Sequence, residues 1–231
     1  MASRRKGASG AQRRRDKLGR KTNSAGTRQI RSLFGIVVEG ETEKRYFGME
    51  YFHEPSVKVM VNPGKPNDPP ALARAADALI EELKRGGELR SGDQIWVVLD
   101  ADDWADAQLE EVFRWSQERR EKGDRGVGLC IPQFEYWLLL HFEDGRGVGT
   151  KAEVLHRLER YLPGYRKNVP LFFMEEDIKA AVGRARARVP EEFCTLADLD
   201  AAIGRGTAST TVHFLVERMV QSLTDARALP Q

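Results

Sequence analysis

The sequence is poor in cysteine and contains no long apolar run. Its two cysteines, Cys130 and Cys194, are too few for a disulfide framework or a zinc cluster. No segment reaches the roughly 18 uncharged apolar residues that would predict a membrane span. No apolar segment follows the basic residues at the start, so we expect no secretory signal. These absences favour a cytoplasmic protein that has no membrane partner.

The composition is that of a folded chain. Of its 231 residues, 41% are hydrophobic and 31% are charged. A disordered chain has fewer apolar residues, so we expect a globular protein with a hydrophobic core.

Basic residues are concentrated at the N-terminus, although the whole chain has a net charge of only +2. Residues 1–31 contain 11 basic residues and one acidic residue, and the rest of the chain is acidic overall. This segment cannot bury enough apolar surface to fold alone. We interpret it as a flexible arm that contacts nucleic-acid phosphates, the alternative being a solubilising terminus. The candidate nucleic-acid contacts are Arg13, Arg14, Arg15, Lys17, Arg20 and Lys21.

Short β-branched runs alternate with segments of helical periodicity. We expect strands over residues 30–38, 57–61, 94–99 and 126–130. We expect helices over residues 41–52, 70–84, 104–121, 132–142, 150–161, 174–189 and 210–223. This order predicts an α/β fold with a mostly parallel, four-stranded sheet. We divide the chain into the basic arm over 1–31, an α/β core over 32–145 and a helical extension over 146–231.

Acidic residues follow three of the four predicted strands. Glu39 and Glu43 follow the first strand, Asp100 and Asp102 the third, and Glu135 the fourth. Ligand sites in open α/β sheets lie beyond the carboxyl ends of the strands. Clustered carboxylates repel one another unless a cation compensates them, and hard divalent cations prefer oxygen ligands. The pattern therefore predicts a site for Mg²⁺ or Mn²⁺ that is suited to phosphodiester hydrolysis.

We assign the metal ligands to Glu39, Asp100 and Asp102. Glu43 and Glu135 either complete the carboxylate shell or position water. Lys167 follows a Pro-Gly turn and either stabilises negative charge on a phosphate or is a solvated loop residue. The catalytic candidates are thus Glu39, Glu43, Asp100, Asp102, Glu135 and Lys167. His141 could be a proton shuttle, but we favour a structural residue that bonds a backbone carbonyl.

These motifs resemble known families. A Glu-Gly turn after the first strand and Asp-x-Asp after the third are the pattern of the Toprim fold. Two glutamates four residues apart resemble its OLD-type variant. Most of the chain also resembles RloB-like proteins, which occur beside restriction–modification and phage-defence genes. The strongest match is Pro-Gln-Phe-Glu-Tyr-Trp-Leu-Leu-Leu-His-Phe at residues 132–142, with others at 36–47, 95–102, 163–167 and 209–216.

The resemblance implies a Toprim-like, metal-dependent nuclease in antiviral defence. Glu39 matches the Toprim glutamate, Asp100 and Asp102 match the Asp-x-Asp, Glu43 matches the second OLD-type glutamate, and Glu135 matches the acid of the Phe-Glu block. The substrate would be RNA, with tRNA as one candidate, or DNA.

Other points stay open in the sequence. Cys130 stands where many RloB-like members have a serine, which puts any role of that hydroxyl in doubt. A homodimer or a partner protein of the defence system would both be consistent with the pattern. The alternative function is a non-catalytic nucleic-acid-binding or sensor module. The complete set of Glu39, Asp100 and Asp102 favours the enzyme.

Overall fold

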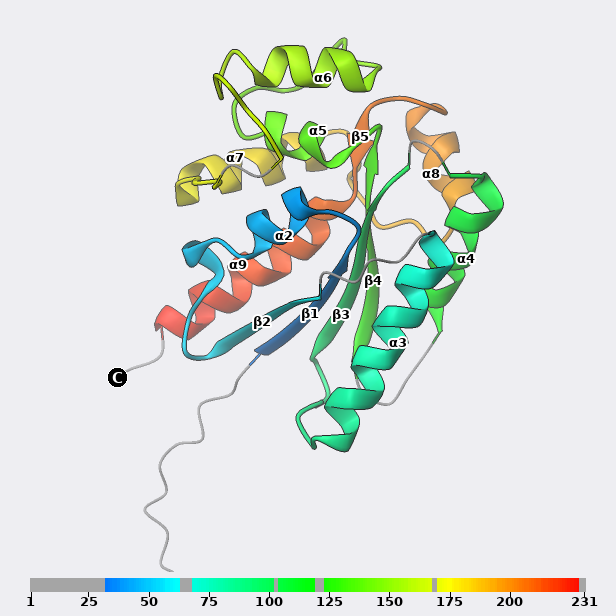
Figure 1. Ribbon diagram of the computed structural model, residues 1–231, viewed down its shortest axis with the longest axis vertical. Coiled ribbons are helices and arrows are strands. Elements are labelled where there is room, and N and C mark those ends of the chain that lie inside the picture. Colours follow the sequence, from blue (N-terminus) through cyan, green and yellow to red (C-terminus); the bar gives the residue numbers. More distant parts are fainter. Residues whose placement is uncertain (1–31, 63–67, 102–103, 119–122, 168–169, 229–231) are drawn as a thin grey trace, which may run out of the picture. The chain divides into compact units, whose positions relative to one another are not determined.

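A parallel β-sheet forms the centre of the protein (Figure 1). The computed structural model describes residues 32–62, 68–101, 104–118, 123–167 and 170–228. Strands β1 (Ser32–Val38), β2 (Val57–Asn62), β3 (Gln94–Asp100) and β4 (Asp124–Ile131) run parallel in the order β2-β1-β3-β4. The predicted α/β fold with a mostly parallel sheet is confirmed. The basic arm and its six candidate contacts lie outside the described residues.

The sheet has a fifth strand that the sequence did not predict. Strand β5 (Ser209–Thr210) pairs antiparallel with the end of β4, with Thr210 opposite Cys130. The expected count of four strands, and a helix beginning at residue 210, are therefore wrong at this point. Helix α9 (Val212–Ala228) begins only after the strand. Two residues are too short to produce the alternating pattern by which strands are recognised.

Helices cover both faces of the sheet. Helices α3 (Pro69–Arg85) and α4 (Asp106–Gln117) lie on one face, and α2 (Glu41–Phe47) and α9 lie on the other (Figure 1). Asp68 caps α3 by accepting a hydrogen bond from the Ala71 N–H, and Pro69 occupies its first turn. The apolar stripe that predicted this helix packs on β1 and β3. No helix in the described part of the chain is long and apolar enough to cross a membrane.

The other helices lie beyond the strands or connect them. They are η1 (Glu50–Phe52), α5 (Phe134–Leu139), α6 (Lys151–Leu158), α7 (Glu175–Arg186) and α8 (Leu196–Ile203). The helix predicted over 41–52 is split into α2 and η1, with Gly48 ending α2. Helix α8 was not predicted.

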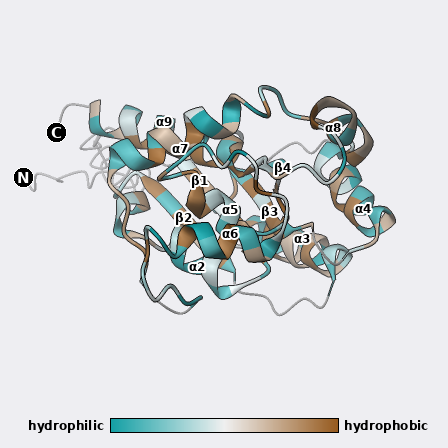
Figure 2. Cartoon of the chain, turned by 90° about the horizontal axis from the view of Figure 1, so that it is seen from above, coloured by the Kyte–Doolittle hydropathy of each residue, from teal (hydrophilic) through white to brown (hydrophobic). Residues whose placement is uncertain are grey.

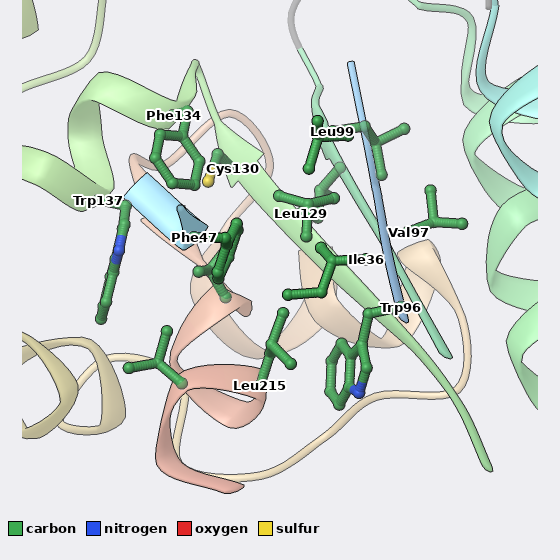
Figure 3. Close-up of a cluster of buried hydrophobic side chains, with 14 of the residues drawn as sticks. Ile36, Phe47, Trp96, Val97, Leu99, Leu129, Cys130, Phe134, Trp137 and Leu215 are labelled. Carbon is green, nitrogen blue, oxygen red and sulfur yellow. The ribbon is translucent and has the colours of Figure 1, made fainter. Parts of the chain in front are cut away.

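The hydrophobic core lies between the sheet and its helices. Residues 33–38 of β1 are all buried, as expected for a parallel strand covered on both faces. Figure 2 shows apolar strands in the interior and polar residues on the outer helices. In Figure 3, side chains of β1, β3 and β4 meet Leu215 of α9 and Phe134 and Trp137 of α5. This packing holds α5 and α2 over the carboxyl ends of the strands.

His141 is a structural residue of this core, as the sequence interpretation favoured. Its ring is buried, with Nδ1 3.0 Å from the Trp137 carbonyl oxygen and Nε2 3.1 Å from the Tyr46 hydroxyl. A neutral ring satisfies both contacts, with Nδ1–H donating to the carbonyl and the Tyr46 hydroxyl donating to Nε2. Burial lowers the pKa of His141 to about 3.

Acid is expected to destabilise the fold through this histidine. In the unfolded chain His141 titrates near its ordinary pKa of 6.5, whereas its pKa in the fold is about 3. The unfolded state therefore binds more protons between these values, and stability falls as the pH drops from 6.5 towards 3, by roughly a few kcal/mol. His213, whose pKa burial lowers to about 4, acts in the same direction.

The test is the Tm measured against pH for the wild type and His141→Gln. Part of the decrease in Tm at acidic pH should disappear in this variant, because glutamine carries no titrating ring. His53→Gln is the control, since His53 is exposed. Identical pH profiles for the wild type and His141→Gln would contradict the assignment.

Candidate metal centre and active site

The sheet order creates a switch point between β1 and β3. From β1 the chain passes to β2 on one side, and it then crosses to β3 on the other side of β1. The carboxyl ends of two such strands border a crevice, where open α/β sheets bind ligands. Glu39 follows β1, and Asp100 is the last residue of β3. The Asp100 backbone N–H donates to Glu39 Oε2 at 3.2 Å, which joins the two strand ends directly.

Glu43 reaches this edge of the sheet from the first turn of α2. Its side chain is only 4% exposed. A Cβ at Gly40 would lie 2.8 Å from Glu43 Oε2, so any other residue there would push the carboxylate aside. Burial raises the pKa of Glu43 to about 7, its own backbone N–H opposes the rise, and the charges of Glu135 and Glu39 add to it.

The Asp100 carboxylate has little to compensate its charge. Its Oδ1 is enclosed and has no hydrogen-bond partner among the described residues. Burial raises the pKa of Asp100 well above its usual range, and the charges of Glu43, Glu39 and Glu135 raise it further. Four of the predicted carboxylates thus share one region and repel one another. Asp102 lies outside the described residues, so its place in the cluster stays a prediction.

Glu135 is held firmly in the first turn of α5. The residue is 1% exposed, and three groups converge on a single oxygen, Oε1. The Tyr165 hydroxyl donates to it at 3.0 Å and the Thr42 hydroxyl at 3.3 Å. The Lys167 Nζ lies 3.9 Å away, and its side chain is 66% exposed. The carboxylate is therefore fixed inside, while the ammonium group stands where the site opens to solvent.

Sequence reasoning did not assign Thr42 and Tyr165 to the site. Thr42 lies between the motif residues Glu41 and Glu43, and Tyr165 precedes Lys167 by two residues in the Pro-Gly loop. Their closeness to candidate residues was the available signal. Their common contact with Glu135 was not visible, because Thr42 lies 93 residues from Glu135 in the sequence and Tyr165 lies 30 residues from it.

Tyr165→Phe is expected to reduce any catalytic turnover at this site by about tenfold, within the range for groups that orient essential residues. The variant removes only the hydroxyl that holds Glu135 Oε1. The matched control is Tyr161→Phe, because the Tyr161 hydroxyl also donates to a glutamate, Glu143, at 2.9 Å but away from the cluster. The measurement is the rate at which each variant cleaves an oligonucleotide substrate. Equal turnover in the two variants would contradict a positioning role for Tyr165.

Cys130 is buried beside the carboxylates and bonds a threonine. It is the strand partner of Asp100, and its Sγ lies 3.2 Å from Thr210 Oγ1. Burial raises the pKa of the thiol well above its usual range, and the charge of Asp100 adds to the effect. The thiol is therefore neutral, and strand β5 supplies a hydroxyl next to it.

The donor set suits a hard divalent cation. Within the described ranges, no three Asp, Glu, His or Cys side chains are close enough to form a ready metal site, and Asp102 lies outside them. An enclosed carboxylate oxygen on Asp100 and three neighbouring carboxylates nevertheless offer the oxygen ligands that Mg²⁺ and Mn²⁺ prefer. A cation would offset the repulsion that raises the pKa values of Asp100 and Glu43. The chemistry of these donors therefore fits such an ion, although the described side chains alone do not form a ready site.

Comparison with known proteins supports the family. Residues 34–219 match the sequence profile described as RloB-like protein. No curated protein and no solved structure matches the chain significantly. The matched region begins in β1 and ends in α9, and it contains every carboxylate of the cluster. The chain therefore belongs to the RloB-like protein family.

Proposed function

We propose that this protein is a metal-dependent nuclease of the Toprim type that acts in antiphage defence. It hydrolyses phosphodiester bonds of RNA, with tRNA among the candidates, or of DNA. The observation that carries the proposal is the convergence of Glu39, Glu43, Asp100 and Glu135 at the switch point, where one Asp100 oxygen is enclosed without a hydrogen-bond partner among the described residues. Membership of the RloB-like family is compatible with this activity.

Each residue has a role in the proposed reaction. Glu39, Asp100 and Asp102 would hold Mg²⁺ or Mn²⁺, and the bound ion would supply Lewis-acid chemistry for a phosphate. Glu135 is fixed by Thr42 and Tyr165, so it can orient a water or complete the carboxylate shell. Glu43 has a pKa of about 7 in the metal-free protein, so it can release a proton near neutral pH when a cation binds.

Positive charge has two proposed sources. Lys167 stands exposed at the mouth of the site and is suited to contact a phosphate of the substrate. The basic arm over 1–31 would add affinity that depends on salt and not on sequence. Deleting the arm should therefore weaken nucleic-acid binding and reduce its dependence on salt.

The test is incubation of the full chain with total tRNA, single-stranded RNA and plasmid DNA, in Mg²⁺ and in Mn²⁺. An EDTA arm removes the metal, and the double variant Asp100→Asn/Asp102→Asn serves as the inactive control. We expect cleavage of at least one substrate by the wild type, and none in EDTA or by the double variant. Cleavage that survives in both controls would refute the assignment. Binding of nucleic acid without any cleavage would instead support the non-catalytic module.

A further inference from the structure

A cavity opens next to the carboxylate cluster. It has a volume of about 340 Å³ and lies at the carboxyl ends of β3 and β4, bordered by α4 and α8. Ala101, the residue after Asp100, forms part of its wall, and so does Ile131 at the end of β4. Consecutive Cα atoms are 3.8 Å apart, so the cavity begins one residue beyond Asp100. A polymer bound across the strand ends would therefore reach it.

The lining combines apolar and charged groups in a way that suits one nucleotide. Leu109 of α4 and Leu196 of α8 join Ala101 and Ile131 as apolar surface that can face a base. Its volume lies at the lower end of the range for small-molecule sites, and several charged side chains also line it. The cavity is therefore large enough for a nucleobase and its sugar.

The charged groups of the cavity lie on its other walls. Arg205 donates to Asp106 at 2.5 Å, and Asp200 of α8 lies nearby in the lining. A guanidinium has five N–H donors, so the bond to Asp106 leaves donors for a phosphate. A carboxylate such as Asp200 can accept hydrogen bonds from a sugar hydroxyl or a base amino group.

A glycine at the rim leaves room for a ligand. Gly206 also lines the cavity, and beyond its own chain neighbours no atom of the described residues lies within 4 Å of the position that a Cβ would take there. Its φ of +71° favours glycine at this turn.

We propose that this cavity binds one nucleotide of the substrate, adjacent to the phosphodiester bond that is cleaved at the carboxylates. The inference rests on the proposed nuclease function and deepens it by giving the enzyme a nucleotide subsite. Arg205 contacts the phosphate, the apolar wall receives the base, and Asp200 bonds the sugar or the base.

The first experiment measures binding of single nucleotides to the full-length protein in EDTA, by calorimetry. The probes are the four ribonucleoside 5′-monophosphates and their deoxy counterparts. We expect at least one of these nucleotides to bind. Arg205→Ala should lower the affinity for that nucleotide by about tenfold, the loss typical of one hydrogen bond to a charged group. Asp200→Asn should weaken the binding of the same nucleotide. Tighter binding of the ribo or the deoxy series would name the substrate as RNA or DNA.

The matched control is Arg146→Ala. Arg146 and Arg205 are both exposed arginines that pair with a single aspartate, and Arg146 does not line this cavity. Its replacement should leave nucleotide binding unchanged. In cleavage assays, Arg205→Ala should raise KM about tenfold and change kcat by less than about twofold, since it removes binding of a flanking nucleotide.

The outcomes separate this inference from the proposed function. If no nucleotide binds at millimolar concentration, or if Arg205→Ala binds as the wild type does, the subsite is refuted even when polynucleotide cleavage is observed. A different result is that nucleotides bind and Arg205→Ala weakens their binding, while no polynucleotide is cleaved with either metal. In that case the subsite stands and the nuclease proposal fails. If Arg146→Ala and Arg205→Ala weaken binding equally, the effect is one of general charge and the subsite is refuted.

Discussion

Asparagine at Asp100 is expected to reduce metal-dependent cleavage by about a thousandfold while making the metal-free protein more stable. The loss in rate corresponds to the several kcal/mol of charge stabilisation that a divalent ion contributes in such sites. The gain in stability follows from the surroundings of Asp100, where burial and the charges of Glu43, Glu39 and Glu135 disfavour the ionised form. A neutral amide of the same shape removes that repulsion. Each kcal/mol gained would raise the Tm by about 2–4 °C.

The two effects are measured on the same preparation. Thermal unfolding in EDTA should show a higher Tm for Asp100→Asn than for the wild type. Added Mg²⁺ or Mn²⁺ should raise the wild-type Tm and leave the variant nearly unchanged, because a ligand stabilises only the state that binds it.

Asp93→Asn is the matched control, because Asp93 directly precedes β3 and Asp100 ends it. Asp93 is also buried, but it accepts hydrogen bonds from the Leu33 and Arg90 backbone N–H groups at 3.2 and 2.7 Å. Its replacement should lower the Tm and leave cleavage intact. A lower Tm for Asp100→Asn in EDTA would show that the Asp100 carboxylate stabilises the fold, and it would contradict the expected repulsion among the clustered carboxylates.

The central sheet could be predicted because its strands carry a local signal. Residues 33–38 of β1 and 95–99 of β3 are buried on both faces and form continuous apolar runs. Strand β5 has no such signal, since it consists of two residues held by the end of β4. The sequence also placed the helix start at Pro132, whereas α5 begins at Phe134, because Gln133 takes the extended N-cap conformation.

In the candidate site, the sequence could place only those residues that directly follow a strand. Glu39 and Asp100 follow strands, so the rule for parallel sheets places them at one edge. The direction of Glu135 depends on contacts that no local pattern contains, since Thr42 and Tyr165 reach it from different parts of the chain. The sequence thus predicts which carboxylates meet, while tertiary packing decides which of their oxygens are fixed.

The convergence of three groups on Glu135 Oε1 leads to the second large expected effect. Glu135→Gln should reduce cleavage by about a hundredfold or more while the fold is retained, in the upper range for groups that orient a metal site. An amide oxygen can still accept from the Thr42 and Tyr165 hydroxyls, so the side chain keeps its place. It loses the negative charge that faces Lys167 and any ability to orient a water as a carboxylate does.

Metal affinity distinguishes the two roles that remain open for Glu135. If it orients water, Glu135→Gln should bind Mn²⁺ within about threefold of the wild type, whereas Glu39→Gln should bind it far more weakly. If Glu135 completes the metal shell, both variants lose affinity together, by about tenfold or more.

Glu143→Gln provides the control for this substitution. Glu143 also accepts a tyrosine hydroxyl, from Tyr161, and also pairs with a cation, Arg157, yet it lies outside the carboxylate cluster. Its replacement should leave cleavage unchanged. If Glu143→Gln and Glu135→Gln reduce cleavage equally, the loss reflects a general sensitivity to removed charge. Only a loss confined to Glu135→Gln would place the chemistry at the carboxyl ends of β1 and β3, under the first turn of α5.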